Sequence, residues 1–117
     1  MKLYGIPNCN TVKKAQDWLK SNGSDYEFHD FKKKGITAEK LNEWFRIFGW
    51  EKVINKAGLT FKKLTKEEQA KINTPEAVVE YLLANTSAIK RPIVEKDGKA
   101  ILLGFKEDEY QALLIEN

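Results

Sequence analysis

The stretch KLYGIPNCNTVKKAQDWLKSNG, residues 2–23, predicts a strand, a loop and a helix in direct succession. Its opening KLYGI is a short apolar run that ends at Pro7, which is typical of a buried strand followed by a loop. Beyond the loop, apolar residues recur at helical spacing until a stop signal at Asn22-Gly23; they are Val12, Ala15, Trp18 and Leu19. The only cysteine in the sequence, Cys9, therefore falls just ahead of this helix.

A second strand is expected over the aromatic-rich residues 25–31, which completes a βαβ unit with parallel strands. The run Lys32-Lys33-Lys34 that follows is interpreted as a solvated turn. Helices are then predicted behind threonine caps, at Thr37, at Thr65 with Glu68 three residues later, and at Thr74 before Pro75.

The last quarter of the chain changes back to strands. After Pro92, two apolar runs joined by Asp97-Gly98 predict a hairpin, and the tail predicts a final helix. Residues 53–64 fit no single pattern. The predicted order is β-α-β, a helical insert over about residues 36–88, and β-β-α, all within one domain spanning residues 1–117.

Composition restricts the class of protein. The chain has 117 residues, of which 42% are hydrophobic, and no apolar run or leading signal segment indicates a membrane protein or export. One cysteine and one histidine are too few for a usual zinc site, so no metal is expected, and a reducing, cytoplasmic location is predicted. The net charge of +3 is too small to indicate direct nucleic-acid binding. The only arginines are Arg46 and Arg91.

Cys9 is the main candidate for chemistry. At a helix N-terminus, unpaired backbone N–H groups and the helix dipole favour an anion, which lowers the pKa of a thiol and makes it nucleophilic. The alternative is an inert, buried cysteine, but the flanking Asn8 and Asn10 indicate a polar loop. The neighbouring Lys13 and Lys14 add positive charge that water largely screens.

The element order, with a cysteine in the first loop and a proline before the third strand, resembles the thioredoxin fold. In that fold a cis proline faces the reactive cysteine, and Pro92 is the residue that matches it. Arg91, directly before this proline, would stabilise a thiolate and offer paired donors to an oxyanion or carboxylate.

Four segments carry a closer resemblance over nearly the whole chain: YGIPNCNTVKKAQDWL (4–19), HDFKKKGI (29–36), VINKAGLTFKKL (53–64) and IKRPIVEKDGKAILLGFKEDEY (89–110). Together they resemble the arsenate-reductase-related ArsC/Spx family, and within it the YffB-like branch. The resemblance implies an α/β thioredoxin-like fold with a four-stranded mixed sheet, and Cys9 and Arg91 at the active site.

Two departures from the family pattern bear on function. Arsenate reductases of this kind pair the cysteine with three arginines, whereas only Arg91 matches here and Asn55 and Lys106 stand at the other two positions. Lysine lacks the planar fork that holds an oxyanion, so arsenate reduction is the less favoured function. Spx-type regulators, which bind RNA polymerase, usually carry Cys-x-x-Cys, and here Val12 replaces the second cysteine.

A single thiol needs its second sulfur from another molecule. The leading hypothesis is therefore a monomeric, glutathione-dependent thiol-disulfide oxidoreductase that acts on an unknown oxidised substrate. Cys9 and Arg91 are the predicted catalytic residues; the predicted substrate-binding residues are Asn8, Asn10, Thr11, Lys13, Asn55, Lys56, Pro92 and Lys106. The alternatives are an Spx-like module that binds polymerase without catalysis and, less favoured, a hydrolase built on a Cys9–His29 pair. Against this pair, His29 is expected to be an exposed polar residue at the end of its strand.

Overall fold

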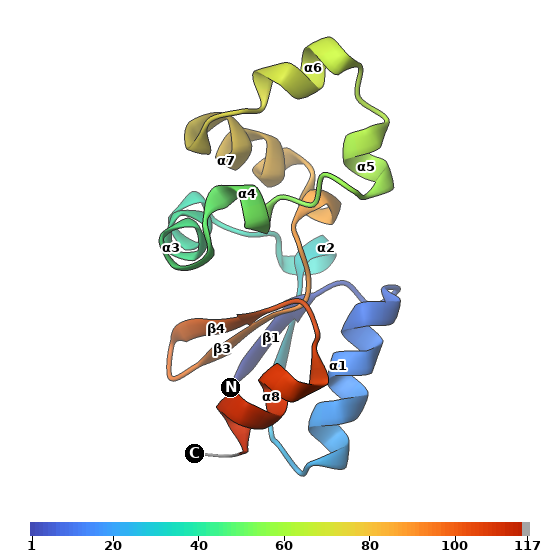
Figure 1. Ribbon diagram of the computed structural model, residues 1–117, viewed down its shortest axis with the longest axis vertical. Coiled ribbons are helices and arrows are strands. Elements are labelled where there is room, and N and C mark those ends of the chain that lie inside the picture. Colours follow the sequence, from blue (N-terminus) through green and yellow to red (C-terminus); the bar gives the residue numbers. More distant parts are fainter. Residues whose placement is uncertain (116–117) are drawn as a thin grey trace. The chain divides into compact units, whose positions relative to one another are not determined.

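The computed structural model describes residues 1–115 and divides into two compact units. The first unit contains Met1–Asp30 and the chain from Arg91 onward, and the second is Phe31–Lys90. The second unit covers the region where the sequence predicts a helical insert, and it is entirely helical apart from its loops and one isolated bridge (Figure 1).

The first unit is built on the predicted four-stranded mixed sheet. Its strands lie in the order β2-β1-β3-β4, with β1 and β2 parallel and the other pairs antiparallel. The strands are β1 (Lys2–Gly5), β2 (Glu27–Asp30), β3 (Ile93–Lys96) and β4 (Lys99–Leu103). The register between β3 and β4 shifts between Val94 and Glu95. The sequence-based prediction of an α/β fold with this sheet is confirmed.

The hairpin between β3 and β4 turns at Asp97-Gly98, as predicted. Asp97 has φ 55° and Gly98 has φ 78°, the two positive values that a type I′ turn requires. This turn places the end of β4 back beside the start of β3, where the N–H of Gly104 donates to the carbonyl oxygen of Pro92 at 2.7 Å.

Helices α1 (Asn10–Ser21) and α8 (Glu107–Leu114) pack on the core of this unit (Figure 1). The four apolar residues predicted to face inward from α1 are all buried. The core cluster consists of Leu3, Val12, Ala15, Trp18, Leu19, Val94, Leu102 and Tyr110. Tyr110 of α8 is fully buried, meets the ring of Trp18 edge-on at 5.6 Å, and donates its hydroxyl to the carbonyl oxygen of Gly104 at 2.7 Å.

The second unit is a set of short helices. They are α2 (Phe31–Lys34), α3 (Ala38–Phe48), α4 (Trp50–Val53), α5 (Leu59–Lys62), α6 (Lys66–Lys71), α7 (Pro75–Ala84) and the 3-10 turn η1 (Thr86–Ala88). The predicted caps at Thr37, Thr65 and Thr74 are all present, and the Thr65 cap forms the full capping box with Glu68. The lysine run 32–34 is exposed as expected, but it lies in the one-turn helix α2 and not in a turn.

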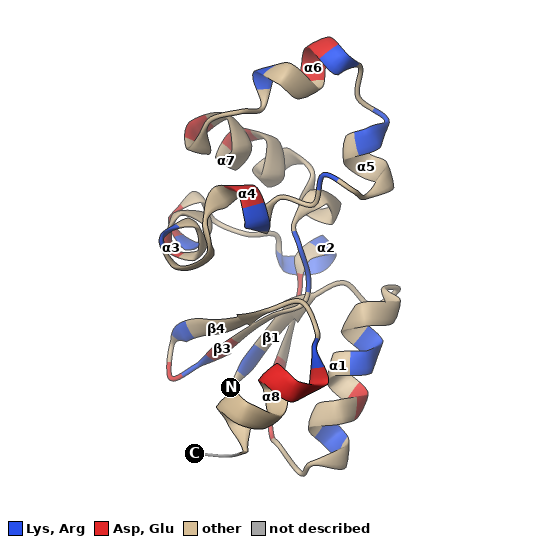
Figure 2. Cartoon of the chain, viewed as in Figure 1, with Lys and Arg blue, Asp and Glu red and all other residues tan. Residues whose placement is uncertain are grey.

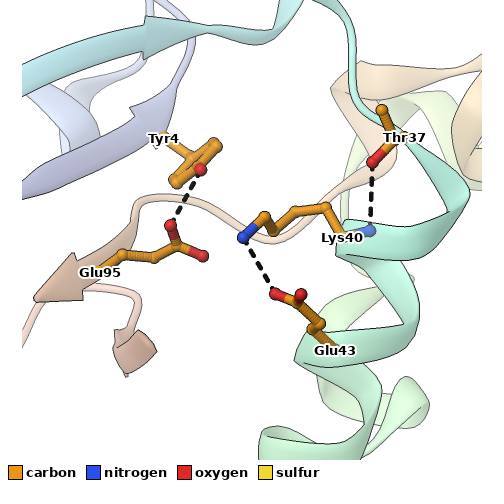
Figure 3. A network of polar contacts seen from close by, with 5 residues as sticks. All are labelled: Tyr4, Thr37, Lys40, Glu43 and Glu95. Atoms are coloured by element: carbon orange, nitrogen blue, oxygen red, sulfur yellow. Dashed lines mark hydrogen bonds and ion pairs between the residues drawn. The ribbon is translucent and has the colours of Figure 1, made fainter. Parts of the chain in front are cut away.

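Figure 3 shows polar contacts from each unit. In the first unit the buried Tyr4 donates its hydroxyl to Glu95 at 2.9 Å, which satisfies a carboxylate inside the sheet region. In the second unit Lys40 donates its backbone N–H to the Thr37 hydroxyl and pairs its ammonium with Glu43 at 2.9 Å.

Within residues 1–115, no helix combines the length and the apolar character that crossing a bilayer requires.

Candidate active site

Cys9 is the N-cap of α1. Its backbone is extended, with φ −122° and ψ 123°, and its carbonyl oxygen accepts the N–H of Lys13 at 3.0 Å, which begins the helix. The side chain is half-buried and packs against the core cluster of the first unit. The thiol is thus held at the helix N-terminus while part of it stays accessible to solvent.

The position of this helix start depends on Gly5, the last residue of β1. A Cβ atom at Gly5 would lie 2.8 Å from Cγ2 and 3.1 Å from Cγ1 of Val12. The absence of a side chain therefore lets the first turn of α1 approach the strand closely, with Val12 buried in the core. This contact positions the same turn whose N–H groups face the cysteine.

The electrostatics of the site favour the thiolate. Partial burial raises the pKa of Cys9, but the N–H of Val12, the guanidinium of Arg91 and the N–H of Thr11 together lower it below its ordinary value. A neutral thiol is a weak acceptor of hydrogen bonds. The same N–H groups bind the charged form much better, which is the reason for the lowered pKa.

Arg91 lies beside this thiol and precedes the start of β3 by two residues. The largest influence on the pKa of Cys9 is burial, which raises it, and the next is the Val12 N–H, which lowers it. Arg91 lowers this pKa further, both as a hydrogen-bond donor and through its charge. Arg91 is half-buried, Pro92 is buried, and the peptide bond between them is cis, as the thioredoxin resemblance implies. The pairing of Pro92 with Gly104 fixes this segment to the end of β4.

Comparison with known proteins assigns the chain to a family. Residues 4–113 match the ArsC family. The chain belongs to the ArsC family.

Two solved structures and one curated relative are similar to this ArsC-family protein over most of their length. The structure of a protein named YFFB has a TM-score of 0.90 and 44% identity, covering 97% of each chain. An arsenate reductase (ArsC) related protein from Brucella melitensis has a TM-score of 0.74 and 44% identity, covering 96% of this chain and 92% of that one. The global transcriptional regulator Spx of Streptococcus pyogenes is 29% identical over 115 residues, which are 96% of this chain and 83% of Spx. The predicted thioredoxin-like fold and the predicted likeness to the YffB-like branch are confirmed.

The remaining candidate residues of the first unit are polar and solvated in this ArsC-family protein. Asn8 lies in the turn before Cys9, and Asn10 and Thr11 are the first two residues of α1; all three are exposed. Lys13 is exposed on α1, and Lys106 is the exposed N-cap of α8. Their role in substrate binding stays a prediction.

Asn55 and Lys56 belong to the second unit. The N–H of Asn55 donates to the carbonyl oxygen of Ala88 at 2.7 Å, and its side-chain amide packs so closely on Gly58 that a Cβ there would be 2.8 Å from Nδ2. Lys56 is exposed, and its ammonium lies 5.5 Å from the centre of the Trp50 ring. Both residues thus have local partners, and their part in binding glutathione also stays a prediction.

His29 differs from the expectation of an exposed residue at a strand end. It is the third residue of β2, half-buried, and pairs in register with Tyr4, whose ring centre is 4.7 Å away. The hydrolase alternative gains no support from this packing. Among the described residues, no cluster of three or more His, Cys, Asp or Glu side chains is arranged to hold a metal ion.

Sequence reasoning missed Gly5 as a residue that shapes the site. A glycine at the end of a predicted strand is a signal for close backbone approach, but the partner of that approach, Val12, is seven residues away in another element. The sequence predicts only that N–H groups at a helix N-terminus lower the pKa of Cys9. The structure identifies two of them as the N–H groups of Val12 and Thr11.

Proposed function

We propose that this protein is a glutathione-dependent thiol-disulfide oxidoreductase in which Cys9 is the nucleophile. The observation that carries the proposal is the lowered pKa of Cys9 at the N-terminus of α1, where the Val12 N–H, the Arg91 guanidinium and the Thr11 N–H together outweigh the effect of burial. The likeness to a protein described as arsenate reductase (ArsC) related supports a thiol-based reductase in general terms.

The chemistry is thiol-disulfide exchange. The Cys9 thiolate attacks one sulfur of a substrate disulfide, which forms a mixed disulfide and releases the other sulfur as a thiolate that takes a proton from water. A glutathione thiolate then attacks the substrate sulfur of the mixed disulfide, which releases Cys9 as a thiolate again. A second glutathione reduces the resulting substrate–glutathione disulfide. In total the substrate gains two electrons and two protons, and two glutathiones become glutathione disulfide.

The other predicted residues have supporting roles in this scheme. Arg91 stabilises the thiolate both before attack and when Cys9 leaves the mixed disulfide, which is the step that a low thiol pKa accelerates. Glutathione carries two carboxylates, and the proposed donors to them are Lys13, Asn55, Lys56 and Lys106. Asn8, Asn10, Thr11 and Pro92 are proposed to contact the substrate next to the attacked sulfur.

Mass spectrometry of the intact protein after exposure to oxidised glutathione tests this function. Wild type is expected to form one glutathione adduct, on Cys9, within seconds to minutes, and Arg91→Ala to form it at least several-fold more slowly because its thiol pKa is higher. Arg46→Ala is the matched control, since Arg46 is exposed on α3 and is the other arginine of the sequence. An adduct rate equal in all three proteins would contradict the role of Arg91, and no adduct on wild type would contradict the reductase function.

A second candidate is a protein-binding module that acts on transcription without catalysis. It is favoured by the 29% identity with a global transcriptional regulator over 96% of this chain. Val12 at the position of a second cysteine removes the intramolecular disulfide that would switch such a module. Recovery of RNA polymerase from a lysate equally well by immobilised wild type and Cys9→Ser, together with an unreactive Cys9, would favour this candidate.

Arsenate reduction is the less favoured variant of the enzymatic proposal. Arg91 is the single arginine among the three expected oxyanion-binding positions, and Lys106 is a solvated ammonium at the start of α8. Such a group binds a tetrahedral oxyanion as a point charge, without the bidentate geometry of arginine. Arsenate-dependent oxidation of glutathione by this protein at a rate comparable to disulfide reduction would reverse this ranking.

A further inference from the structure

A groove lies between α1 and α8 in the first unit, separate from the thiol. Its walls are Lys14, Asp17 and Trp18 of α1 on one side and Phe105, Glu107 and Gln111 on the other, and its volume is about 440 Å³. This volume is within the range of roughly 300–1,000 Å³ that ligand sites occupy. We refer to it below as the α1–α8 groove.

Trp18 and Phe105 are the aromatic residues that line the α1–α8 groove, and both pack on Tyr110, which lies in the core and does not line the groove. The buried Tyr110 contacts Trp18 edge-on at 5.6 Å and Phe105 edge-on at 4.8 Å, and its hydroxyl is bonded to the Gly104 carbonyl. The three rings and the turn before α8 therefore form one packed assembly. Aromatic side chains held in place in this way lose little side-chain entropy when a ligand packs on them.

The rim of the groove is charged. Asp17 comes from α1 and Glu107 from the first turn of α8, so both helices contribute a carboxylate to the groove that Trp18 and Phe105 line, and both carboxylates are exposed. Lys14 adds one positive charge at the end of the groove that is closer to Cys9 along α1. Figure 2 shows the acidic first turn of α8 and the mixed charges along α1. Two carboxylates around aromatic rings fit a cationic side chain, whose stem packs on the rings while its charge meets the rim.

The face of α1 that lines the groove extends toward the cysteine. Residues 14, 17, 18 and 21 of α1 line it, and their spacing places them on one stripe of the helix. One turn toward the N-terminus, the same stripe reaches Asn10 and Thr11, which directly follow Cys9. Asp17 is eight residues beyond Cys9, about 12 Å along the helix axis. An extended peptide covers that distance with about four residues.

We propose that the α1–α8 groove binds an extended peptide segment with a cationic side chain about four residues from the oxidised cysteine of a protein substrate. The inference rests on the proposed thiol-reductase function and adds to it that the substrate is a protein, recognised beyond its disulfide. The peptide runs along the α1 stripe from Cys9, and its Lys or Arg side chain lies over Trp18 and Phe105 between Asp17 and Glu107.

Binding is measured first without redox chemistry, in the Cys9→Ser protein. The probe is the peptide acetyl-Lys-Phe-Gly-Gly-Ser-Gly-Gly-Phe-Lys-amide, in which serine replaces the substrate cysteine and a lysine stands four residues away in either chain direction. The comparison peptide has glutamate in place of both lysines. NMR titration of the ¹⁵N-labelled protein reports the affinity and the site, through the Trp18 indole N–H and the backbone amides of α1 and α8.

The lysine peptide is expected to bind at least five-fold more tightly than the glutamate peptide and to shift signals of the groove. Asp17→Asn is expected to weaken the lysine peptide about two- to five-fold, the size of one exposed ion pair. Glu80→Gln on α7, an exposed carboxylate of the second unit, is the matched control and leaves the affinity unchanged. Equal affinity for the two peptides, or shifts that lie outside the groove, would overturn the proposal.

The kinetic arm uses the same lysine peptide with cysteine in place of serine, supplied as its mixed disulfide with glutathione. Asp17→Asn is expected to raise KM about two- to five-fold with kcat unchanged, and an unchanged KM would overturn the proposal. The two ideas fail separately. If the peptide occupies the groove of Cys9→Ser but wild-type Cys9 does not react with oxidised glutathione, the groove stands as a peptide site and the reductase function falls.

Discussion

Replacement of Gly5 by alanine is the most direct test of how the fold prepares the thiol. The new Cβ would lie 2.8 Å from Val12 Cγ2 and 3.1 Å from Cγ1, whereas carbon atoms in contact normally stay about 3.5–4.0 Å apart. Val12 cannot rotate away easily, because a valine in a helix has one strongly preferred rotamer. The first turn of α1 must therefore move away from β1 by several tenths of an ångström or more.

Two effects of Gly5→Ala follow. Overpacking of this kind destabilises by about 1–3 kcal/mol, which for a chain of this size lowers the melting temperature by roughly 3–15 °C. The displaced turn also carries the Val12 N–H away from the sulfur. Since that N–H is the largest of the contributions that offset burial and lower the pKa of Cys9, the pKa rises toward its ordinary value.

The assay is the rate of iodoacetamide alkylation of Cys9 as a function of pH, together with thermal melting followed by circular dichroism. Gly23→Ala is the matched control: Gly23 follows the C-terminal end of α1, has φ +65° and no atom within 4 Å of an added Cβ. That change destabilises by about 1–2 kcal/mol through the backbone alone, so it is expected to lower the melting temperature without altering the alkylation profile. A Gly5→Ala protein with the wild-type profile would refute the argument that the strand–helix contact positions the N–H donors.

Three further outcomes are expected. The pKa of Cys9 is lower in the folded protein than in the unfolded chain. Wild type is therefore expected to gain stability relative to Cys9→Ser as pH rises from the folded pKa to the free-thiol value of about 8.5, and to lose this gain as pH falls through the folded pKa. Urea unfolding at several pH values measures the difference in the free energy of unfolding. Tyr110→Phe removes the 2.7 Å bond to the Gly104 carbonyl and is expected to destabilise by about 1–2 kcal/mol in urea unfolding. Thr74→Ala removes the hydrogen bond from the Ala77 N–H to the Thr74 hydroxyl and is expected to lower the free energy of unfolding by about 1 kcal/mol. Relative to wild type, hydrogen exchange is expected to speed up more in α7 than in α1.

Local signals in the sequence predicted most of the elements. The apolar spacing in α1, the threonine caps and the Asp97-Gly98 turn each act within a few residues, and each is present in the structure. Residues 53–64 match no single local pattern, because the structure of their first residues depends on a distant segment. There Ile54 forms an isolated bridge with Ile89, and the N–H of Lys90 donates to the carbonyl oxygen of Val53 at 2.6 Å.

The candidate site likewise has features that the local sequence predicts and features that depend on contacts between distant elements. Placing Cys9 at a helix N-terminus needs only the local pattern. Its contact with Arg91 joins residues far apart in the chain, and it is predicted through the resemblance to the thioredoxin fold and to the family. The close approach of Gly5 to Val12 and the α1–α8 groove were not predicted, because both arise from packing between elements. The packing of His29 on Tyr4 was missed for the same reason.

The half-buried thiol at the start of α1 has no second cysteine in this sequence to protect it. A peroxide converts such a thiolate to a sulfenic acid, and a neighbouring cysteine would ordinarily trap that product as an internal disulfide. Here the sulfenic acid either condenses with a small external thiol or advances to the irreversible sulfinic acid. The supply of small external thiols is therefore expected to decide how long Cys9 stays reduced in the presence of peroxide.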